Sequence, residues 1–268
     1  MGETGYDIQL DRHEAKYIIP MSMVPEIRRF IQPFCKPDPH AHGAPPEYVV
    51  TTLQLDTPGL SLYHAVEWEA LNRFKLRVRT YGEPGESPVF LEVKRKIRQT
   101  IVKSRSIVPA EAWGRDLVTD MRPTISFRSR KEEECFLQFV RLVRDVGAEP
   151  VLLVRYTRES YMSRVDSYAR VTMDRKLMYH TAHSWSDWGE AGRWRAMDTA
   201  LAQDKGYDFS GIVLELKMLS FAPRWILDMV KEFDLVRVGN CKYATAVGEE
   251  AILRGSPAMP DYACELFW

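Results

Sequence analysis

Hydrophobic and polar residues alternate along the middle of the chain, and this alternation predicts β-strands. Successive side chains of a strand point to opposite faces, so a period of two separates the two kinds of residue. The run Phe74–Tyr81 alternates in this way, Val89–Lys96 repeats it after a Gly-Glu-Pro-Gly turn, and Thr100–Val108 follows. We therefore expect an antiparallel meander. Five more strand-like runs stand at Leu10–Ile19, Tyr48–Asp56, Pro150–Tyr161, Ala169–Asp174 and Gly211–Leu219.

Apolar residues at helical spacing predict helices between and after these strands. One helix is expected at Lys131–Val146, which ends before Gly147, a residue suited to the left-handed position after a helix. Shorter helices are expected at Met23–Pro33, Pro223–Phe233 and Ala244–Leu253. Together with the strands, they indicate an α+β fold that is mainly antiparallel β.

Length and composition are those of an ordinary globular protein. The 268 residues, of which 45% are hydrophobic and 28% charged, can bury a normal core. Internal repeats, low-complexity tracts and long linkers are absent from the sequence, so we expect a single domain over residues 1–268. No stretch approaches the ~20 apolar residues needed to cross a bilayer, and we expect no membrane insertion by this chain.

Charge and cysteine content limit the classes of binding partner and the cellular compartment that we expect. Lysine plus arginine (37) equals aspartate plus glutamate (37), so no overall field favours binding to nucleic acid. Any basic site must be local. Cys35, Cys135, Cys241 and Cys264 stand far apart without zinc-ligand spacing, as expected of reduced thiols in the cytoplasm.

The polar positions of the strands are unusually cationic. In the first meander strand Lys75, Arg77 and Arg79 share one face, and in the second Lys94 and Lys96 do so together with a single glutamate. A sheet with one face in water explains such a pattern in one strand. The same alternation recurs, however, at Arg12, Glu14 and Lys16, at Lys103 and Arg105, at Arg170, Thr172 and Asp174, and at Glu215 and Lys217.

This recurrence predicts that the sheet closes into a barrel with a basic bore. Cations packed together in a bore repel one another unless an anion joins them. Phosphate fits best, because guanidinium groups match its oxygens in pairs and lysine adds a point charge. Glu14, Glu92 and Glu215 lie among the bases; each alone is equally consistent with ion pairing, but together they suggest oxygen ligands for Mg²⁺ or Mn²⁺.

Several ordered segments resemble a known family, the VTC domain of polyphosphate polymerases, within the CYTH or triphosphate tunnel metalloenzyme superfamily. The resemblance covers nearly the whole chain, and ordered motifs on this scale are specific. The segments are Arg12–Tyr17, Thr51–Thr57, Asn72–Gly82, Phe90–Lys96, Val154–Tyr156, Ala169–Asp174, Val213–Lys217 and Cys241–Tyr243.

The resemblance implies a closed eight-stranded antiparallel tunnel with flanking helices, which transfers the γ-phosphate of ATP onto polyphosphate with the help of Mn²⁺ or Mg²⁺. By the same resemblance Arg77, Arg79 and Arg155 would grip the transferring phosphate and Glu215 would bind the metal, with Glu92 and Glu14 as further candidates. The implied phosphate-binding residues are Lys16, Arg77, Arg79, Lys94, Lys103, Arg155, Arg170 and Lys242. The superfamily often begins with Glu-x-Glu-x-Lys, and Arg12 at the first acidic position favours one metal over two.

The sequence leaves three functions open, because one bore serves them all. They are a polyphosphate polymerase, a metal-dependent triphosphatase or polyphosphatase, and a module that binds polyphosphate or nucleotide without turnover. A membrane-protein partner is also left open. The loop His183–Trp194 contains Trp185, Trp188 and Trp194, which would stack on an adenine, fold this insertion onto the barrel or mark a partner surface.

Overall fold

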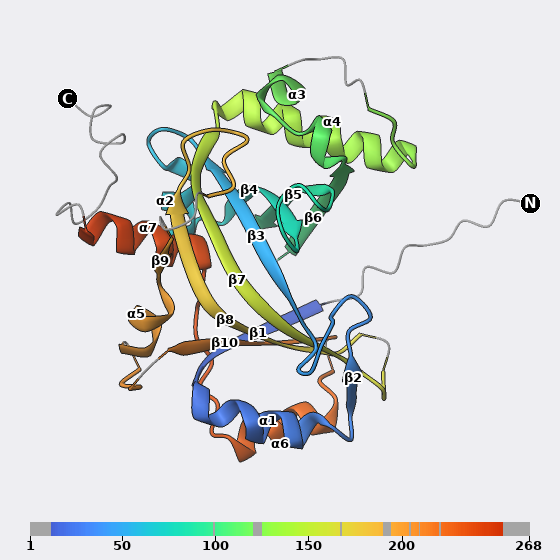
Figure 1. The fold of residues 1–268 in the computed structure, drawn as a ribbon, viewed down its shortest axis with the longest axis vertical. Helices are drawn as coiled ribbons and strands as arrows, with labels where there is room; N and C mark the ends of the chain where they lie inside the picture. The colour runs from blue at the N-terminus through green and yellow to red at the C-terminus, as the bar shows by residue number, and fades with distance from the viewer. Residues whose placement is uncertain are drawn as a thin grey trace, which may run out of the picture. The chain divides into compact units, whose positions relative to one another are not determined.

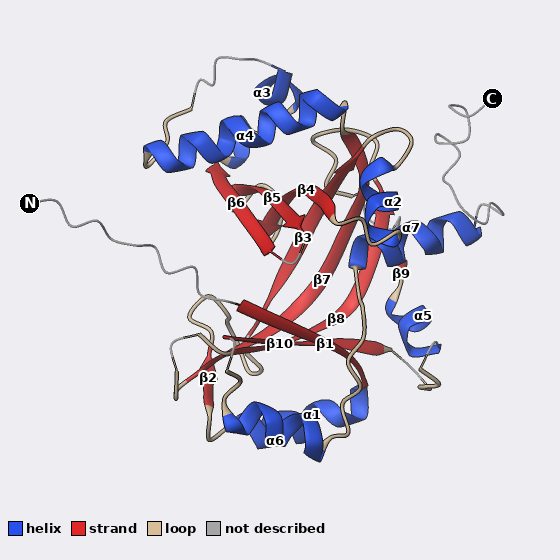
Figure 2. Cartoon of the chain, turned by 180° about the vertical axis from the view of Figure 1, so that it is seen from behind, coloured by secondary structure: helices blue, strands red, loops and turns tan. Residues whose placement is uncertain are grey.

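The computed structural model describes residues 12–98, 100–119, 125–166, 168–189, 194–203, 205–208, 210–219 and 221–253 (Figure 1). Strands and helices alternate in groups along the chain (Figure 2). The strands are β1 (Arg12–Pro20), β2 (Cys35–Pro37), β3 (Glu47–Asp56), β4 (Asn72–Tyr81), β5 (Val89–Ile97), β6 (Thr100–Val108), β7 (Glu149–Ser163), β8 (Arg170–Thr181), β9 (Arg195–Ala196) and β10 (Gly211–Leu219). The helices are α1 (Val24–Ile31), α2 (Ser61–Glu67), α3 (Arg115–Thr119), α4 (Arg130–Val146), α5 (Asp198–Gln203), α6 (Arg224–Glu232) and α7 (Lys242–Leu253), with short 3₁₀ turns at Met21–Met23 and Ala110–Ala112.

Eight strands form one path in the order β1-β10-β8-β7-β3-β4-β5-β6, while β2 pairs with β7 and β9 with β8. The pairings that join β1 to β10, β10 to β8, and β3 through β6 are all antiparallel. The mainly antiparallel α+β fold predicted from the sequence is therefore confirmed. Among the described residues the path has β1 and β6 at its ends, and closure of the expected barrel stays a prediction.

The chain forms two compact units, each assembled from three segments. Unit 1 comprises Met1–Tyr48, Arg158–Arg175 and Asp198–Asn240. Unit 2 comprises Val49–Thr157, Lys176–Met197 and Cys241–Trp268. Strands β7 and β8 run through both units. The expectation of one domain over the whole chain stays a prediction.

In unit 2, helix α4 covers the apolar face of the meander. Ser129 caps its start by accepting a hydrogen bond from the backbone N–H of Glu132 at 3.2 Å, and Gly147 ends it with a φ of 63°. The buried helix residues Phe136 and Phe139 pack with one face of β3, β4 and β5. The residues of that face are Leu53, Leu55, Leu76, Val78, Val89, Leu91 and Val93. The alternate face of the same strands is left for polar side chains.

In unit 1, helices α1 and α6 lie side by side over β1 and β10 (Figures 1 and 2). Ile27 of α1 and Trp225 and Met229 of α6 are buried against the apolar positions of the strands. Those positions are Ala15, Tyr17, Ile19, Val171, Met173, Ile212, Leu214 and Leu216. Unit 1 therefore repeats the arrangement of unit 2, with helices on one face of the strands and charged residues on the other.

The predicted elements agree with the structure apart from their ends and the shortest helices. Strand β10 has the predicted bounds, whereas β8 continues seven residues beyond Asp174, to Thr181. Of the predicted strand at Leu10–Ile19, residues 10 and 11 lie outside the described residues. The indole of Trp185 is buried and donates to Glu149 at 2.8 Å, so this tryptophan folds the insertion loop onto unit 2.

We predict that Phe139→Ala lowers the free energy of unfolding by about 3–5 kcal/mol, because it removes a fully buried ring between α4 and the sheet. Urea unfolding followed by circular dichroism measures the change. Leu137→Ala on the same helix is the matched control, because Leu137 is 45% exposed and its truncation should change stability little. Equal losses in the two variants would contradict the packing of α4.

Candidate functional site

The polar face of β4, β5 and β6 gathers eight cations around one acid, and we call it the basic face. Residues directly opposite one another in an antiparallel pair share a face. Lys75 lies opposite Lys94, which lies opposite Lys103, so three lysines form a row across the strands. In the next row Arg77, Glu92 and Arg105 oppose one another. The basic face comprises Arg73, Lys75, Arg77, Arg79, Lys94, Lys96, Lys103 and Arg105, with Glu92 as its acid.

Glu92 is the centre of the arginine part of this face. Its carboxylate accepts from Nε of Arg77 at 2.6 Å and lies 3.5 Å from Arg79 and 3.4 Å from Arg105. Burial alone raises the pKa of Glu92, but the three guanidinium groups outweigh it and lower the pKa to about 2. The side chains of Glu92 and Arg79 are only 13% and 12% exposed. These charges therefore interact in a partly desolvated environment.

The segment Cys241–Tyr243 contacts other parts of unit 2 through all three of its side chains. Lys75 Nζ donates to Cys241 Sγ at 2.8 Å, and Lys242 Nζ lies 4.9 Å from the centre of the Tyr156 ring. The hydroxyl of Tyr243 donates to Asp56 at 2.9 Å. The start of α7 is thereby tied to strands β3, β4 and β7, and Lys242 is positioned by its two neighbours.

Asp56 is the buried anchor of that segment. Besides the Tyr243 hydroxyl, its carboxylate accepts backbone N–H groups of Thr57, Leu62 and Tyr63 at 2.7 to 2.9 Å. Burial raises the pKa of Asp56, and these four donors oppose the rise. Asp56 therefore organises the first turn of α2 and supports the site without carrying an exposed charge.

Unit 1 holds a second cluster, in which acids and bases alternate, and we call it the mixed-charge face. Lys16 Nζ lies 3.4 Å from Glu14 and 3.7 Å from Glu215, and Lys217 lies 3.8 Å from Glu215. Strand register places Thr172 opposite Glu215. The face comprises Glu14 and Lys16 of β1, Glu215 and Lys217 of β10, and Arg170, Thr172 and Asp174 of β8.

Arg158 is a member of this cluster that the sequence analysis missed. Its guanidinium binds Asp174 through two hydrogen bonds of 2.7 Å and reaches Glu215 at 3.5 Å. The predicted residue was Arg155, which lies three positions earlier and so points to the opposite face of β7. Arg155 instead binds Glu83 at 2.5 Å and lies 5.9 Å from the Trp194 ring.

The remaining predicted residues divide between the two faces. Arg77, Arg79, Lys94 and Lys103 lie together on the basic face. Lys16, Arg170, Glu14 and Glu215 lie together on the mixed-charge face, where Arg170 is exposed opposite Lys217. Lys242 belongs to the segment anchored on unit 2.

The carboxylates differ in how well they suit a divalent cation. Within the described residues no group of three or more His, Cys, Asp or Glu side chains is arranged to hold a metal. Glu14 and Glu215 both lie close to the Lys16 ammonium group, and Glu215 also lies within 3.8 Å of Arg158 and Lys217. The buried Thr172 hydroxyl opposite Glu215 has no hydrogen-bond partner among the described residues. These oxygens suit Mg²⁺ or Mn²⁺, which need few carboxylates when phosphates complete the shell. Glu92, like Glu215, lies near three cations; what sets Glu215 apart is the neighbouring carboxylate of Glu14 and the Thr172 hydroxyl.

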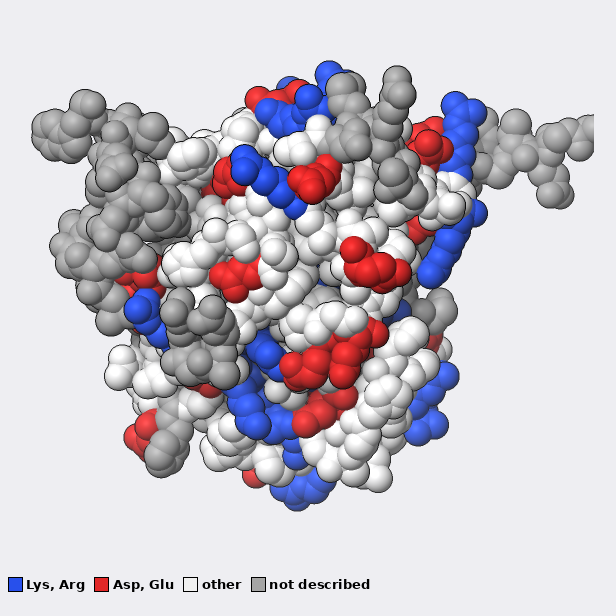
Figure 3. Space-filling view, turned by 45° about the horizontal axis from the view of Figure 1, so that its top comes forward, with Lys and Arg blue, Asp and Glu red and all other residues white. Residues whose placement is uncertain are grey.

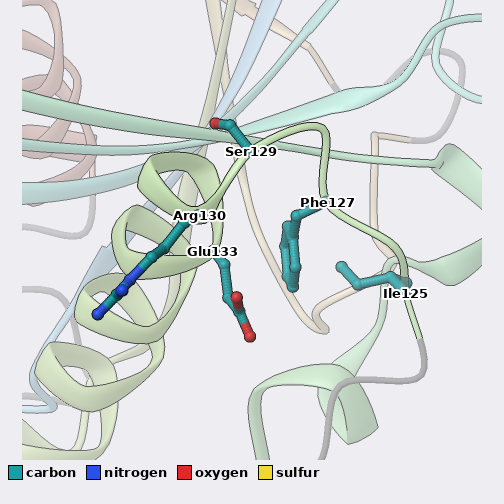
Figure 4. Close-up of a pocket in the computed structure, with 5 residues that line it drawn as sticks. All are labelled: Ile125, Phe127, Ser129, Arg130 and Glu133. Atoms are coloured by element: carbon teal, nitrogen blue, oxygen red, sulfur yellow. The ribbon is translucent and has the colours of Figure 1, made fainter.

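One surface pocket of the described residues is also lined by cations, namely Arg28, Arg29 and Arg164 of unit 1. The pocket in Figure 4, of 480 Å³, opens at the start of α4 between Phe127 and Glu133 and contains one arginine, Arg130, beside that glutamate. Figure 3 shows side chains of both signs on the face that it presents. Because lysine plus arginine equals aspartate plus glutamate in the whole chain, the concentration of one sign on the basic face is a local feature.

Comparison with known proteins shows the family. A family model described as the VTC domain matches residues 11–249. The chain belongs to the VTC domain family. This VTC domain includes both charged faces and all the predicted site residues, and it confirms the resemblance seen in the sequence.

Two further comparisons add little to the family assignment. No curated protein matches the chain. Among solved structures, the PH1819 protein from Pyrococcus horikoshii OT3 is similar with a TM-score of 0.43 and 11% identity, over 90% of this chain and 99% of that one. Within the described part of this VTC domain, no helix combines the length and apolar character needed to cross a bilayer.

We predict that Glu92→Gln removes part of the pH dependence of stability. Because the folded-state pKa of Glu92 is lowered to about 2, its ion pairs stabilise the protein above the unfolded pKa and lose this effect as the pH falls toward 2. The difference in urea midpoint between wild type and Glu92→Gln should therefore shrink between pH 7 and pH 3.

Glu134→Gln on the outer face of α4 is the control, because Glu134 is exposed in its ion pair with Arg130. Its difference from wild type should be small at both ends of the pH range. A gap for Glu92→Gln that stays constant from pH 7 to pH 3 would show that the three arginines do not stabilise this carboxylate.

Proposed function

We propose that this VTC domain is a metal-dependent phosphotransferase that moves the γ-phosphate of ATP onto a polyphosphate chain. The observation that carries the proposal is the composition of the basic face, where Glu92 is the one acid among eight cations. Family membership supports a polyphosphate-related function. Our proposal adds three points to this family-level function: polymerase activity, ATP as the phosphate donor and dependence on a metal ion.

The arrangement of the cations favours a chain of phosphates over a single phosphate. Residues two positions apart on a strand are about 7 Å apart, and neighbouring strands are about 4.8 Å apart. The basic face therefore repeats positive charge in two directions, along β4 and across to β6. A polyanion with regularly repeated charges can contact several of these groups at once.

Relief of the electrostatic repulsion within the face would contribute to the free energy of binding a polyanion. Like charges directly opposite one another destabilise a sheet, and Lys75, Lys94 and Lys103 stand in such a row. Phosphate oxygens would replace this repulsion with charge-assisted hydrogen bonds. Partial burial of Arg77 and Arg79 strengthens the effect, since the surrounding dielectric is lower than in water.

The proposal retains the closed eight-stranded tunnel that the sequence predicts, with the inward-facing cations of its strands lining one bore. Glu14 and Glu215 would hold Mg²⁺ or Mn²⁺. When bound, the metal neutralises negative charge on phosphate oxygens. Glu92 stays with its arginines in this proposal.

The reaction requires no nucleophile from the protein. An oxygen of the terminal phosphate of polyphosphate attacks the γ-phosphorus of ATP, the bond from that phosphorus to the β,γ-bridging oxygen breaks, and ADP leaves. Phosphoryl transfer of this kind depends on in-line positioning and on compensation of charge on the equatorial oxygens. Arg77 and Arg79 supply that charge, and their rigid attachment to β4 supplies the positioning.

We place the reaction in the cytoplasm, where ATP is available. The three cysteines of the described residues are free thiols, in keeping with that compartment.

The decisive experiment is incubation of the purified chain with ATP and Mn²⁺, with separation of the products on a gel stained for polyphosphate. The proposal predicts long phosphate chains together with ADP. Free phosphate without chains would mean that water is the acceptor and the protein is a hydrolase. Tight binding of ATP without turnover would make it a binding module and would equally overturn the proposal.

We predict that Arg79→Ala weakens binding of tripolyphosphate by about tenfold or more, because it removes a charged hydrogen-bond donor from a partly buried position. The fold should survive, since Glu92 keeps Arg77 and Arg105 as partners. Isothermal titration calorimetry measures the affinity. Arg141→Ala, which removes an exposed arginine paired with Asp145 on α4, is the control and should bind as wild type does. Unchanged affinity in Arg79→Ala would refute the basic face as the binding surface.

A further inference from the structure

A loop and an adjoining hairpin of unit 2 carry exposed apolar side chains, and we call these five residues the apolar tip. Trp68 and Leu71, 77% and 70% exposed, lie between α2 and β4. Ile97, Ile101 and Val102, all more than 40% exposed, lie at the end of β5 and the start of β6. The backbone N–H of Arg98 donates to the carbonyl of Leu71 at 2.7 Å, which joins the loop to the hairpin.

Cations surround this tip. From Lys94 to Arg105 the chain carries six lysines and arginines and no acid. Arg98 and Lys103 are exposed beside the apolar side chains. The acids that adjoin the tip in sequence are Glu67 and Glu69, on either side of Trp68. The six cations are Lys94, Arg95, Lys96, Arg98, Lys103 and Arg105.

Phosphate binding does not account for the apolar side chains. Single exposed hydrophobic residues are common and need no explanation. Here five of them, with a tryptophan included, lie on a loop and a hairpin end that are joined by a hydrogen bond, and binding of a soluble polyanion would not require them. Ile101 lies opposite Lys96 and shares the basic face. Ile97 alternates with Lys96 and so points away from the basic face.

We propose that the apolar tip docks this protein on a membrane that contains anionic lipids. Tryptophan and aliphatic side chains partition together into the interface of a bilayer, while arginine and lysine bind the anionic headgroups. The tip and the cations around it combine both kinds of residue on one loop and one hairpin. A second copy of the chain is a poorer partner, because a symmetric contact would bring like charges together.

This inference does not rest on the reaction proposed above, although Lys94, Lys96, Lys103 and Arg105 also belong to the basic face. The variants that test it change Trp68, Leu71 and Ile97, which lie outside the basic and mixed-charge faces. Failure of the docking would leave the phosphotransferase proposal unaffected, and a protein without turnover could still dock.

The test is co-sedimentation of the whole chain with vesicles of phosphatidylcholine alone and of phosphatidylcholine mixed with phosphatidylglycerol. We expect binding to the mixed vesicles only, weakened by salt. The double variant Trp68→Ser, Leu71→Ser should lose about tenfold in vesicle affinity, because its apolar groups no longer enter the interface. Ile97→Thr, which stays compatible with a strand, should show a smaller loss in the same direction.

Phe221→Ser is the matched control, since Phe221 is 92% exposed on unit 1 and lies outside the tip. It should bind vesicles as wild type does. Trp68 should also be quenched by brominated lipids, and Trp68→Phe should reduce that quenching. An equal loss in Phe221→Ser, no binding to anionic vesicles, or full binding by the double variant would overturn the proposal. So would equal binding to soluble polyglutamate, which would indicate an acidic protein partner.

Competition with tripolyphosphate distinguishes lipid docking by the apolar tip from binding of phosphate groups by the cations alone. Two results together would contradict docking: tripolyphosphate abolishes vesicle binding, and the double variant still binds vesicles. They would show that the cations alone bind the vesicles and that this surface serves as an entry for polyphosphate. The docking proposal predicts the reverse, with the double variant impaired in vesicle binding and normal in tripolyphosphate binding.

Discussion

Repulsion among cations on a single sheet face is the constraint that gives this VTC domain its chemistry. Eight lysines and arginines share the polar face of β4, β5 and β6 with Glu92. Glu92 compensates three arginines at one end of the face, and the row of Lys75, Lys94 and Lys103 lies next to them. A face of this kind is costly for folding and favourable for binding a polyanion, and both effects have the same physical origin.

The helices offset the destabilising effect of the charged faces by packing on the opposite faces of the same strands. In unit 2 the aromatic residues of α4 bury the opposite side of the same strands, and in unit 1 α1 and α6 do the same for β1 and β10. Burial of large side chains on one face supplies the stability that the charged face reduces. The strict alternation of each strand is what allows one segment to contribute to both a core and a binding surface.

Much of the fold and the basic face could be predicted because alternation is visible in single strands. The run Phe74–Tyr81 showed which side chains share a face, and Gly147 marked the end of α4. Helix α2 was missed because its first turn is organised by Asp56, a residue of the preceding strand. Closure between β1 and β6, which the recurring cationic alternation predicts, depends on strands at opposite ends of the path and stays a prediction.

Strand β7 shows why part of the site could not be read from the sequence. Residues 151–154 are apolar at every position and buried, so no period of two is visible there. The sequence therefore could not distinguish Arg155 from Arg158, and contacts were needed to place Arg158 with Asp174 and Glu215. The sequence also could not decide which carboxylates bind a metal ion, because a carboxylate among basic residues can either form ion pairs or coordinate a metal until its neighbours are known.

A crystal structure of the chain soaked with tripolyphosphate tests the central claim most directly. The account predicts phosphate oxygens within hydrogen-bond distance of Arg77 and Arg79, with further phosphates along the row of Lys94 and Lys103. Phosphates bound elsewhere, for example at the arginine-lined pocket beside Arg28 and Arg164, with the basic face empty, would contradict it.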